Sequence, residues 1–344
     1  MMRDRLFTER SEKNMDGMKA KDVFFILIKL AVIVFLFVCL NRLFMPKYVK
    51  ENMDGRITRE YYPASKYTDV VFVGSSTVFS GVSPKVLWDS GISSFDRANA
   101  SQTMWISYFM IEDAIKTRKP ELVCLDMTFV KHEDYFIEEP STRKAIDGMR
   151  WGKTKYKCIV ASKGEDEKMA DYVIPLFRYH ERWKDLTWDD FRYMFYNKPV
   201  TECGFIEDNE IESANASEFA YFGDFSHINA RNEMYLRAAI EECKNNGVQI
   251  MLFKTPAFAG NWSDELDDAI EAVAQEYGIA YYNFDRSIDD IGLDPETDTP
   301  DGGAHLNSAG AEKFSRYIGG IIRNSYDVSD RSTDPDYVAY WDKI

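Results

Sequence analysis

The sequence predicts an α/β fold in which a mostly parallel sheet is covered by helices on both faces. Three observations indicate this fold and its additions. Short β-branched and aromatic runs, typical of buried parallel strands, alternate with segments of helical periodicity. A continuous apolar run near the N-terminus predicts a transmembrane helix. The stretch 131–231, rich in aromatic and charged side chains, breaks the alternation and predicts a helical insert or lid.

The apolar run is residues 23–45, VFFILIKLAVIVFLFVCLNRLFM. About 20 residues at a rise of 1.5 Å cross a bilayer core of roughly 30 Å. The flank 1–22 is basic, so the positive-inside rule predicts a single-pass protein of the cell membrane with a cytoplasmic N-terminus and an extracytoplasmic body. No small-x-small cleavage site follows the run, which favours an uncleaved anchor over a signal peptide. A buried helix of a soluble protein is the other alternative.

The charge distribution supports the same division. The formal net charge is −15, with 42 basic and 57 acidic residues. Residues 1–50 hold ten Lys or Arg and five Asp or Glu, a balance of +5, so the remainder holds 32 and 52, a balance of −20. A general nucleic-acid-binding protein carries a basic surface, so we expect no nucleic-acid partner.

The remaining elements follow in chain order. Residues 46–66 are polar and predict a stalk. Buried runs predict strands at 69–74, 121–126, 248–253 and 279–284, and apolar periodicity predicts helices at 104–118, 232–246, 264–277 and 308–324. Gly247 and Gly278 are placed as C-caps and Ser308 as an N-cap. The predicted domain plan is therefore an α/β domain at 67–130 and 232–325, the insert 131–231, and a C-terminal tail 326–344.

The five cysteines have no C-x-x-C spacing, so neither a zinc site nor a redox motif is predicted. The sequence does not decide whether two of the five cysteines form a disulfide.

Two segments carry chemistry. The first predicted strand ends in Gly74-Ser75-Ser76, and ligands of open α/β sheets bind beyond the carboxyl ends of strands. Near the C-terminus, the run DGGAHLN places Asp301 four residues before His305, which suits a general base and its orienting carboxylate. The alternatives are an ordinary Gly-Ser turn and a helix-capping loop with an incidental histidine.

Together the two segments resemble the SGNH (GDSL-like) hydrolase family. Gly74-Ser75-Ser76 resembles its G-D-S block, and Asp301 to His305 resembles its D-x-x-H block, over a core of roughly 67–127 and 245–325. The chain looks closest to the membrane-anchored branch of Gram-positive bacteria, akin to D-alanyl transfer and alginate O-acetylation proteins. The resemblance implies an SGNH-type three-layer α/β/α sandwich.

The resemblance also implies site roles. It makes Ser76 the nucleophile, with Ser75 as the competing choice, His305 the base and Asp301 its partner. The chain departs from the family pattern at the four-residue spacing before His305 and at the second and third blocks. Candidate oxyanion donors are the N–H of Ser76 and residues at the departing blocks, namely Asn99, Ala100 and Thr128.

Further residues are candidates for substrate binding. Lys254 follows the predicted strand 248–253 and is placed to hold an anionic group, or is a solvated strand-end lysine. Trp262 is placed as a sugar-facing wall, or packs on the sheet edge. Arg178, His180 and Arg182 form a cluster suited to a polymer or lipid headgroup, or to an amphipathic packing helix.

The sequence therefore predicts a membrane-anchored serine esterase acting on acyl esters, such as O-acetyl groups, of cell-envelope carbohydrate or polymer. The alternatives are an O-acyltransferase with the same Ser-His-Asp site and a membrane-bound acyl-donor partner, and an inactive scaffold that binds the envelope. The expected partners are the envelope polymer and the lipid bilayer through residues 23–45. The chemistry implies no metal and no organic cofactor.

Overall fold

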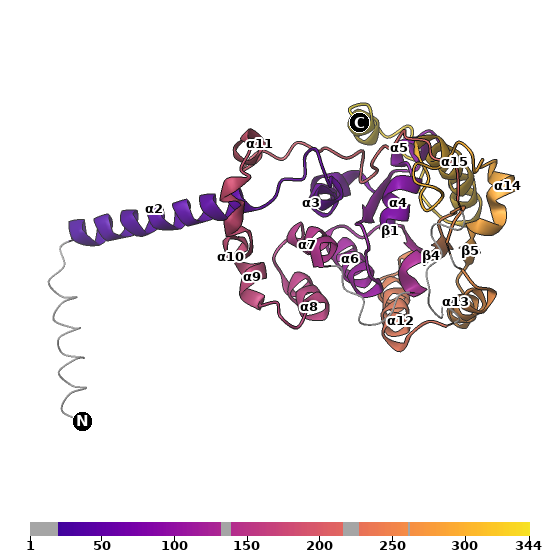
Figure 1. Ribbon diagram of the computed structural model, residues 1–344, viewed down its shortest axis with the longest axis horizontal. Coiled ribbons are helices and arrows are strands. Elements are labelled where there is room, and N and C mark those ends of the chain that lie inside the picture. Colours follow the sequence, from indigo (N-terminus) through magenta and orange to yellow (C-terminus); the bar gives the residue numbers. More distant parts are fainter. Residues whose placement is uncertain (1–19, 132–138, 216–226, 261) are drawn as a thin grey trace, which may run out of the picture. The chain divides into compact units, whose positions relative to one another are not determined.

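A computed structural model describes residues 20–131, 139–215, 227–260 and 262–344 (Figure 1). The chain divides into two compact units. One contains the described residues up to Lys47 together with Ala170–Tyr196, and the other contains Tyr48–Met169 and Asn197–Ile344. The expected flank 1–22 lies mostly outside the described residues.

The first unit is built on α2, Ala20–Phe44, a helix of 25 residues. Its segment Lys21–Phe44 has a mean hydropathy of 3.2 and buries none of its apolar window, so by length and composition it is able to cross a membrane. The other elements of this unit are short: α9 Met169–Val173, which begins at the boundary, α10 Pro175–Tyr179, η3 His180–Lys184 and α11 Trp188–Arg192.

The second unit contains a five-stranded, fully parallel sheet in the order β2-β1-β3-β4-β5. The strands are β1 Val70–Gly74, β2 Ser94–Ala98, β3 Leu122–Asp126, β4 Gln249–Lys254 and β5 Tyr281–Asn283. The first, third and fourth of these are buried along almost their whole length, as the apolar runs predict. The α/β fold is confirmed.

Helices cover both faces of the sheet. Because side chains alternate along a strand, Val70 and Phe72 of β1 face the core cluster that contains Phe314 and Ile318 of α15. On the opposite face α6 packs against β1, and α12 packs against β4 and α6. The larger helices are α3 Asp54–Ala64, α6 Met104–Thr117, α7 Glu139–Asp147, α8 Lys153–Ser162, α12 Ala230–Asn245, α13 Asp264–Tyr277 and α15 Ser308–Ser325. The short ones are η1 Ser65–Tyr67, α4 Ser76–Gly81, α5 Pro84–Trp88, η2 Thr128–Lys131, η4 Phe284–Ser287, α14 Ile288–Ile291 and α16 Pro335–Trp341.

Three local expectations differ from the structure. The polar segment 46–66 contains α3, whose Ile57 and Tyr61 are fully buried, so this part of the chain belongs to the packed body and is not a free stalk. The C-terminal stretch 326–344 contains α16, and the hydroxyl of its buried Tyr337 donates to Asp69 at 3.1 Å. The N-cap of α15 is Asn307, one residue before the predicted Ser308, because its side-chain oxygen accepts the N–H of Gly310.

Gly278 is confirmed as the C-cap of α13, with a left-handed φ of 65°. The C-cap of α12 is Asn246, one residue before the predicted Gly247, which is itself left-handed with a φ of 62°. No disulfide joins the five cysteines, all of which lie in described residues. Within the stretch predicted as an insert, the described residues form the helices α7 to α11, and 206–215 have no regular secondary structure.

Candidate active site

The site begins at the carboxyl end of β1, which lies between β2 and β3 in the sheet. Gly74 ends the strand, Ser75 is the N-cap of α4, and Ser76 is its first residue. Only glycine fits at position 74, since an added Cβ would lie 2.5 Å from a Val78 methyl group and 2.7 Å from the Cβ of Asp126. As the first residue of a helix, Ser76 has an N–H with no intrahelical acceptor.

The two adjacent serines have different surroundings. Ser75 is fully buried, and its Oγ lies 3.0 Å from the Oγ1 of Thr77. Ser76 is half-buried, and its Oγ lies 2.7 Å from Nε2 of His305. The geometry therefore brings Ser76, and not Ser75, to the histidine.

His305 is held by the carboxylate predicted to orient it. Its Nδ1 lies 2.5 Å from Oδ2 of Asp301. The other carboxylate oxygen, Oδ1, accepts the backbone N–H groups of Ala304 and His305, each at 3.1 Å. Partial burial by itself would raise the pKa of Asp301, but the hydrogen bonds and charge of His305 outweigh it and hold this pKa below its usual value. An ionised Asp301 only accepts, so Nδ1 donates to it and Nε2 is left to accept the Ser76 proton.

The four-residue spacing between Asp301 and His305 is accommodated by two glycines. Gly302 and Gly303 have φ of 75° and 113°, a backbone region that strains other residues. The carbonyl of Gly303 also accepts the N–H of Phe258 at 2.9 Å, which ties the loop to the segment after β4. The extra residue relative to the family pattern thus closes the turn without separating the two side chains.

Part of the stretch predicted as an insert supports this loop. The N–H of Asn215 donates to the carbonyl of Gly302 at 2.7 Å, and the N–H of Glu212 donates to Thr299 at 3.0 Å. At the end of the loop, the side-chain amide of Asn307 donates to the carbonyls of Glu210 and Thr297. Residues 208–215 therefore lie alongside the loop that contains Asp301 and His305 and fix its backbone.

Asp126, at the carboxyl end of β3, joins the strand ends under the site. Its carboxylate accepts the hydroxyl groups of Thr77, Thr128 and Thr255 at 3.0–3.2 Å. It also accepts the N–H of Thr255 at 3.0 Å and that of Thr128 at 3.3 Å. Burial raises the pKa of Asp126, and these hydrogen bonds oppose the rise. Sequence reasoning gave this residue no role, although its position at a strand end was the available signal.

The oxyanion candidates outside Ser76 are placed differently from one another. The N–H of Ala100 donates to Asp54 at 3.3 Å, and the amide of Asn99 donates to Gln102 at 2.9 Å within the protein. Neither residue lines the cavity at Ser76, so the structure does not support their assignment as donors. Thr128 does line the cavity, but its hydroxyl and N–H both donate to Asp126. Ser101, with a left-handed φ of 49°, lines the cavity instead of its two predecessors.

A cavity of about 330 Å³ opens beside Ser76 and His305. Apart from these two residues, its walls are Thr77, Ser101, Thr128, Phe129, Lys131, Lys254, Thr255, Ala257, Phe258, Ala259, Gly260, Trp262, Asp285 and Ala304. This volume lies within the range typical of small-molecule sites.

Two predicted substrate-binding residues belong to this cavity, in altered roles. Lys254 is buried, and its ammonium lies 2.6 Å from a carboxylate oxygen of Asp285, so its charge is neutralised within the protein. Trp262 donates its indole N–H to Asp267 at 2.8 Å, and its ring lies 5.2 Å from the Lys254 ammonium. Lys131, which sequence reasoning missed, lines the same cavity, and burial together with Lys254 lowers its pKa to about 8.

The remaining candidates belong to the unit that contains α2. Arg182 donates to the carbonyl of Phe44 at 2.5 Å and to Asp190 at 2.9 Å, and Nδ1 of His180 lies 2.9 Å from the carbonyl of Phe177. Arg178 lies over the ring of Tyr179. None of the three lines the cavity at Ser76.

No protein-family model and no curated protein matches this chain. Among solved structures, the chain is similar to a provisionally assigned acylhydrolase from Bacteroides fragilis, with 14% sequence identity and a TM-score of 0.38. The match covers 77% of this chain and 95% of that chain. So distant a likeness leaves the function of this chain to be argued from its own residues.

Proposed function

We propose that this protein is a membrane-anchored serine esterase that cleaves acyl esters through Ser76, His305 and Asp301. The observation that carries the proposal is the continuous hydrogen-bonded series from Ser76 Oγ to His305 Nε2 and from His305 Nδ1 to Asp301, at 2.7 and 2.5 Å. A serine, an imidazole and a carboxylate in this order serve as nucleophile, base and orienting group in hydrolases of unrelated folds. Here the serine also faces a cavity of substrate size.

The reaction follows from the protonation states. Ser76 Oγ attacks the ester carbonyl carbon while His305 Nε2 takes the hydroxyl proton. The tetrahedral intermediate collapses, the bond to the alcohol oxygen breaks, and His305 returns the proton to that oxygen. Water then attacks the acyl-serine with the same base, releasing the carboxylic acid and the free Ser76 hydroxyl. Asp301 keeps the imidazole in the required tautomer and stabilises its positive charge.

The negative oxygen of the intermediate needs preorganised donors. In this proposal the N–H of Ser76 is the first of them, because the start of α4 leaves it without an intrahelical acceptor. With Asn99 and Ala100 bonded elsewhere, the donor set is sparse. Losing one donor typically slows such reactions about 10²–10³-fold, so we expect slow turnover of small model esters.

The substrate class follows from the cavity and the anchor. Trp262 gives the cavity an aromatic wall, and aromatic rings stack on sugar faces. By the positive-inside rule, the basic N-terminus is cytoplasmic and the body extracytoplasmic, so acyl esters of cell-envelope carbohydrate are its substrates. Transfer of the acyl group to an envelope hydroxyl instead of water uses the same acyl-serine, with the donor ester supplied by a membrane-bound partner.

Labelling with a fluorophosphonate tests the nucleophile. We expect the wild type and Ser75→Ala to be labelled and Ser76→Ala to remain unlabelled. Equal labelling of wild type and Ser76→Ala would remove Ser76 from this role. Absence of both labelling and p-nitrophenyl acetate turnover in the folded wild type would favour a non-catalytic envelope-binding scaffold. Turnover that rises with added glycan at the expense of free acetate would favour the transferase.

A further inference from the structure

The unit built on α2 contains an aromatic segment for which the proposed esterase chemistry has no use. In residues 170–196, nine of the 27 side chains, or one third, are aromatic, whereas aromatic residues make up 15% of the whole chain. They are Tyr172, Phe177, Tyr179, Trp183, Trp188, Phe191, Tyr193, Phe195 and Tyr196. We call residues 170–196 the interfacial segment.

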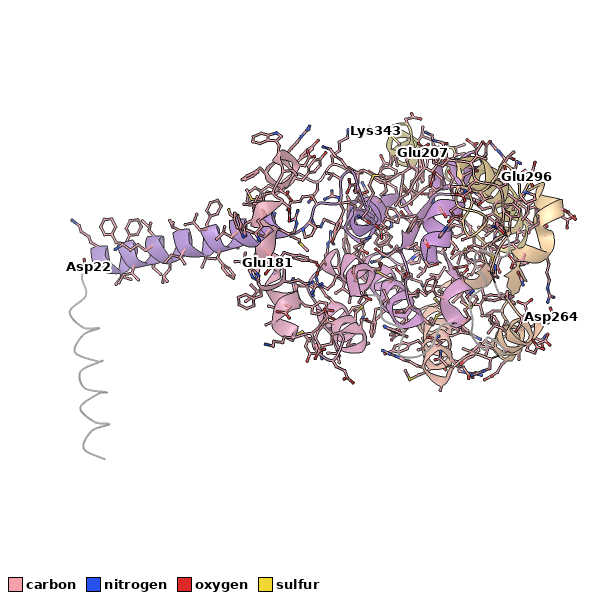
Figure 2. All side chains as sticks on the ribbon, viewed as in Figure 1. Asp22, Glu181, Glu207, Asp264, Glu296 and Lys343 are labelled. Carbon is pink, nitrogen blue, oxygen red and sulfur yellow. The ribbon has the colours of Figure 1, made fainter. Side chains whose placement is uncertain are left out.

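The interfacial segment is attached to the C-terminal end of α2. The N–H of Leu176 donates to the side chain of Asn41 at 3.0 Å, and Arg182 donates to the carbonyl of Phe44 at 2.5 Å. The guanidinium of Arg42 lies 5.2 Å from the centre of the Phe195 ring. Figure 2 shows Glu181, within this segment, beside that end of the helix. These contacts set the segment at the level of residues 41–44.

Most of the aromatic side chains of this segment are exposed on the surface of the protein. Trp188 is 79% exposed and Trp183 is 64% exposed. About half or more of the side-chain surface is also exposed at Val173, Phe177, Phe195 and Tyr196. Large apolar side chains concentrated in this way on one short segment mark a surface that meets a partner.

The depth of the segment identifies the lipid bilayer as that partner. Lys21–Phe44 is 24 residues long, or about 36 Å at 1.5 Å per residue, against roughly 30 Å for a bilayer core. Residues 41–44 therefore lie at the boundary between acyl chains and headgroups. Trp and Tyr concentrate at this boundary, where an apolar ring meets lipid and its polar atom meets water.

The charge of the segment favours insertion of rings over attraction to anionic lipid. It contains four Arg or Lys and five Asp or Glu, a balance of −1. Two of these charges are already paired, since Arg182 and Asp190 lie 2.9 Å apart. Membrane contact by this segment is thus expected with neutral phosphatidylcholine, without an anionic component.

We propose that the interfacial segment lies in the membrane–water interface around the outer end of α2, with Trp183 and Trp188 inserted among the lipid headgroups. This second membrane contact rests on the anchoring role of α2 and is independent of the Ser76 chemistry. It converts a single-helix tether into a broader attachment that restrains the unit containing α2 relative to the bilayer.

Tryptophan quenching by lipid tests this directly, because α2 itself contains no tryptophan. The full chain is reconstituted in phosphatidylcholine vesicles whose acyl chains carry bromine near the headgroup, and its emission is compared with that in unbrominated vesicles. Two of the seven tryptophans are in the segment, so we expect a measurable loss of emission, of at most roughly a quarter. The Trp183→Phe/Trp188→Phe variant is expected to lose this quenching. Trp151→Phe, which removes another exposed tryptophan, is the matched control and is expected to retain it.

Flotation with the vesicles and the far-ultraviolet circular dichroism spectrum are measured for every variant. Quenching in wild type and control that disappears in the double variant supports the proposal. Flotation without wild-type quenching, or equal quenching in the double variant, overturns it and leaves the anchor intact; a protein partner would then be the occupant of this surface. A folded chain that does not float overturns the anchor as well, whereas the fluorophosphonate result tests the esterase separately.

Discussion

Replacing Asp301 with Asn is the most specific test of the proposed site, because the two carboxylate oxygens have separate tasks. Oδ1 accepts the N–H groups of Ala304 and His305, and an amide oxygen in its place preserves both bonds. Oδ2 lies 2.5 Å from Nδ1 of His305, and the NH₂ group that replaces it only donates. Nδ1 must then accept, so the proton moves to Nε2 and faces Ser76.

An imidazole protonated at Nε2 cannot take the Ser76 proton. Loss of the correct tautomer costs about 10⁴ in kcat, which is about 5.5 kcal/mol at 1.36 kcal/mol per tenfold change. The loop keeps its backbone bonds, so the loss of unfolding free energy is limited to about 1–2 kcal/mol, the difference between a charge-assisted and a neutral hydrogen bond.

The assay is kcat and KM for p-nitrophenyl acetate, with the melting temperature of the full chain in detergent. The matched control is Asp298→Asn, which removes a buried carboxylate of the same loop that pairs with Lys313 and makes no contact with His305 in the described structure. We expect it to retain activity within a few fold once the folded fraction is counted. Activity of Asp301→Asn within tenfold of wild type would refute the assignment of Asp301 as the residue that sets the tautomer.

Three further substitutions test the supporting structure. Asp126→Ala leaves five hydrogen-bond donors without their acceptor. We expect the free energy of unfolding, measured in urea, to fall by about 3 kcal/mol and esterase activity to fall with it. Unchanged stability would contradict the role of Asp126 in joining the strand ends. Gly74→Ala brings a Cβ within 2.5 Å of Val78, so a melting temperature within one degree of wild type would contradict the close approach. Buried Asp96 has no hydrogen-bond partner for its carboxylate within the described residues, and burial raises its pKa well above the usual value. The folded state therefore holds a proton on Asp96 that the unfolded chain releases above about pH 4. The contribution of Asp96 to the free energy of unfolding therefore falls by about 1.4 kcal/mol per pH unit as pH rises from there toward the folded pKa. Asp96→Asn is expected to remove this contribution, and parallel stability–pH curves for the two proteins would disprove the assignment.

Much of the architecture was predictable because its signals are local. Continuous β-branched runs identify β1, β3 and β4, since strands buried on both faces have no polar positions to interrupt them. The helix after β4 and its Gly278 end were read from periodicity and a C-terminal glycine. The observed α2, Ala20–Phe44, begins three residues before the predicted span 23–45 and ends one residue before that span ends.

The predictions for 46–66 and 326–344 were wrong because both segments are polar in sequence and yet contain buried residues. Residues 46–66 look solvated, yet Arg56 is buried because its guanidinium bonds Glu60 within α3 and the carbonyl of Lys198. In the C-terminal stretch, Tyr337 is buried, and its hydroxyl donates to Asp69, which is far away in the sequence. A polar side chain satisfied by a distant partner leaves no pattern in its own neighbourhood.

The same distinction applies at the candidate site. The sequence by itself predicted Ser76 and His305 as candidate catalytic residues. Ser76 follows a buried strand, His305 follows an acidic loop that contains two glycines, and the family resemblance points to the same two residues. Only the tertiary structure shows that Ser76, and not Ser75, contacts His305, and that Asn99 and Ala100 bond to other residues. It also pairs Lys254 with Asp285 and places Asp126 beneath the strand ends. The physical reason is that hydrogen-bond partners and burial depend on which strand ends the parallel sheet brings together, and that arrangement joins residues from positions 74 to 305 that no local stretch of sequence contains.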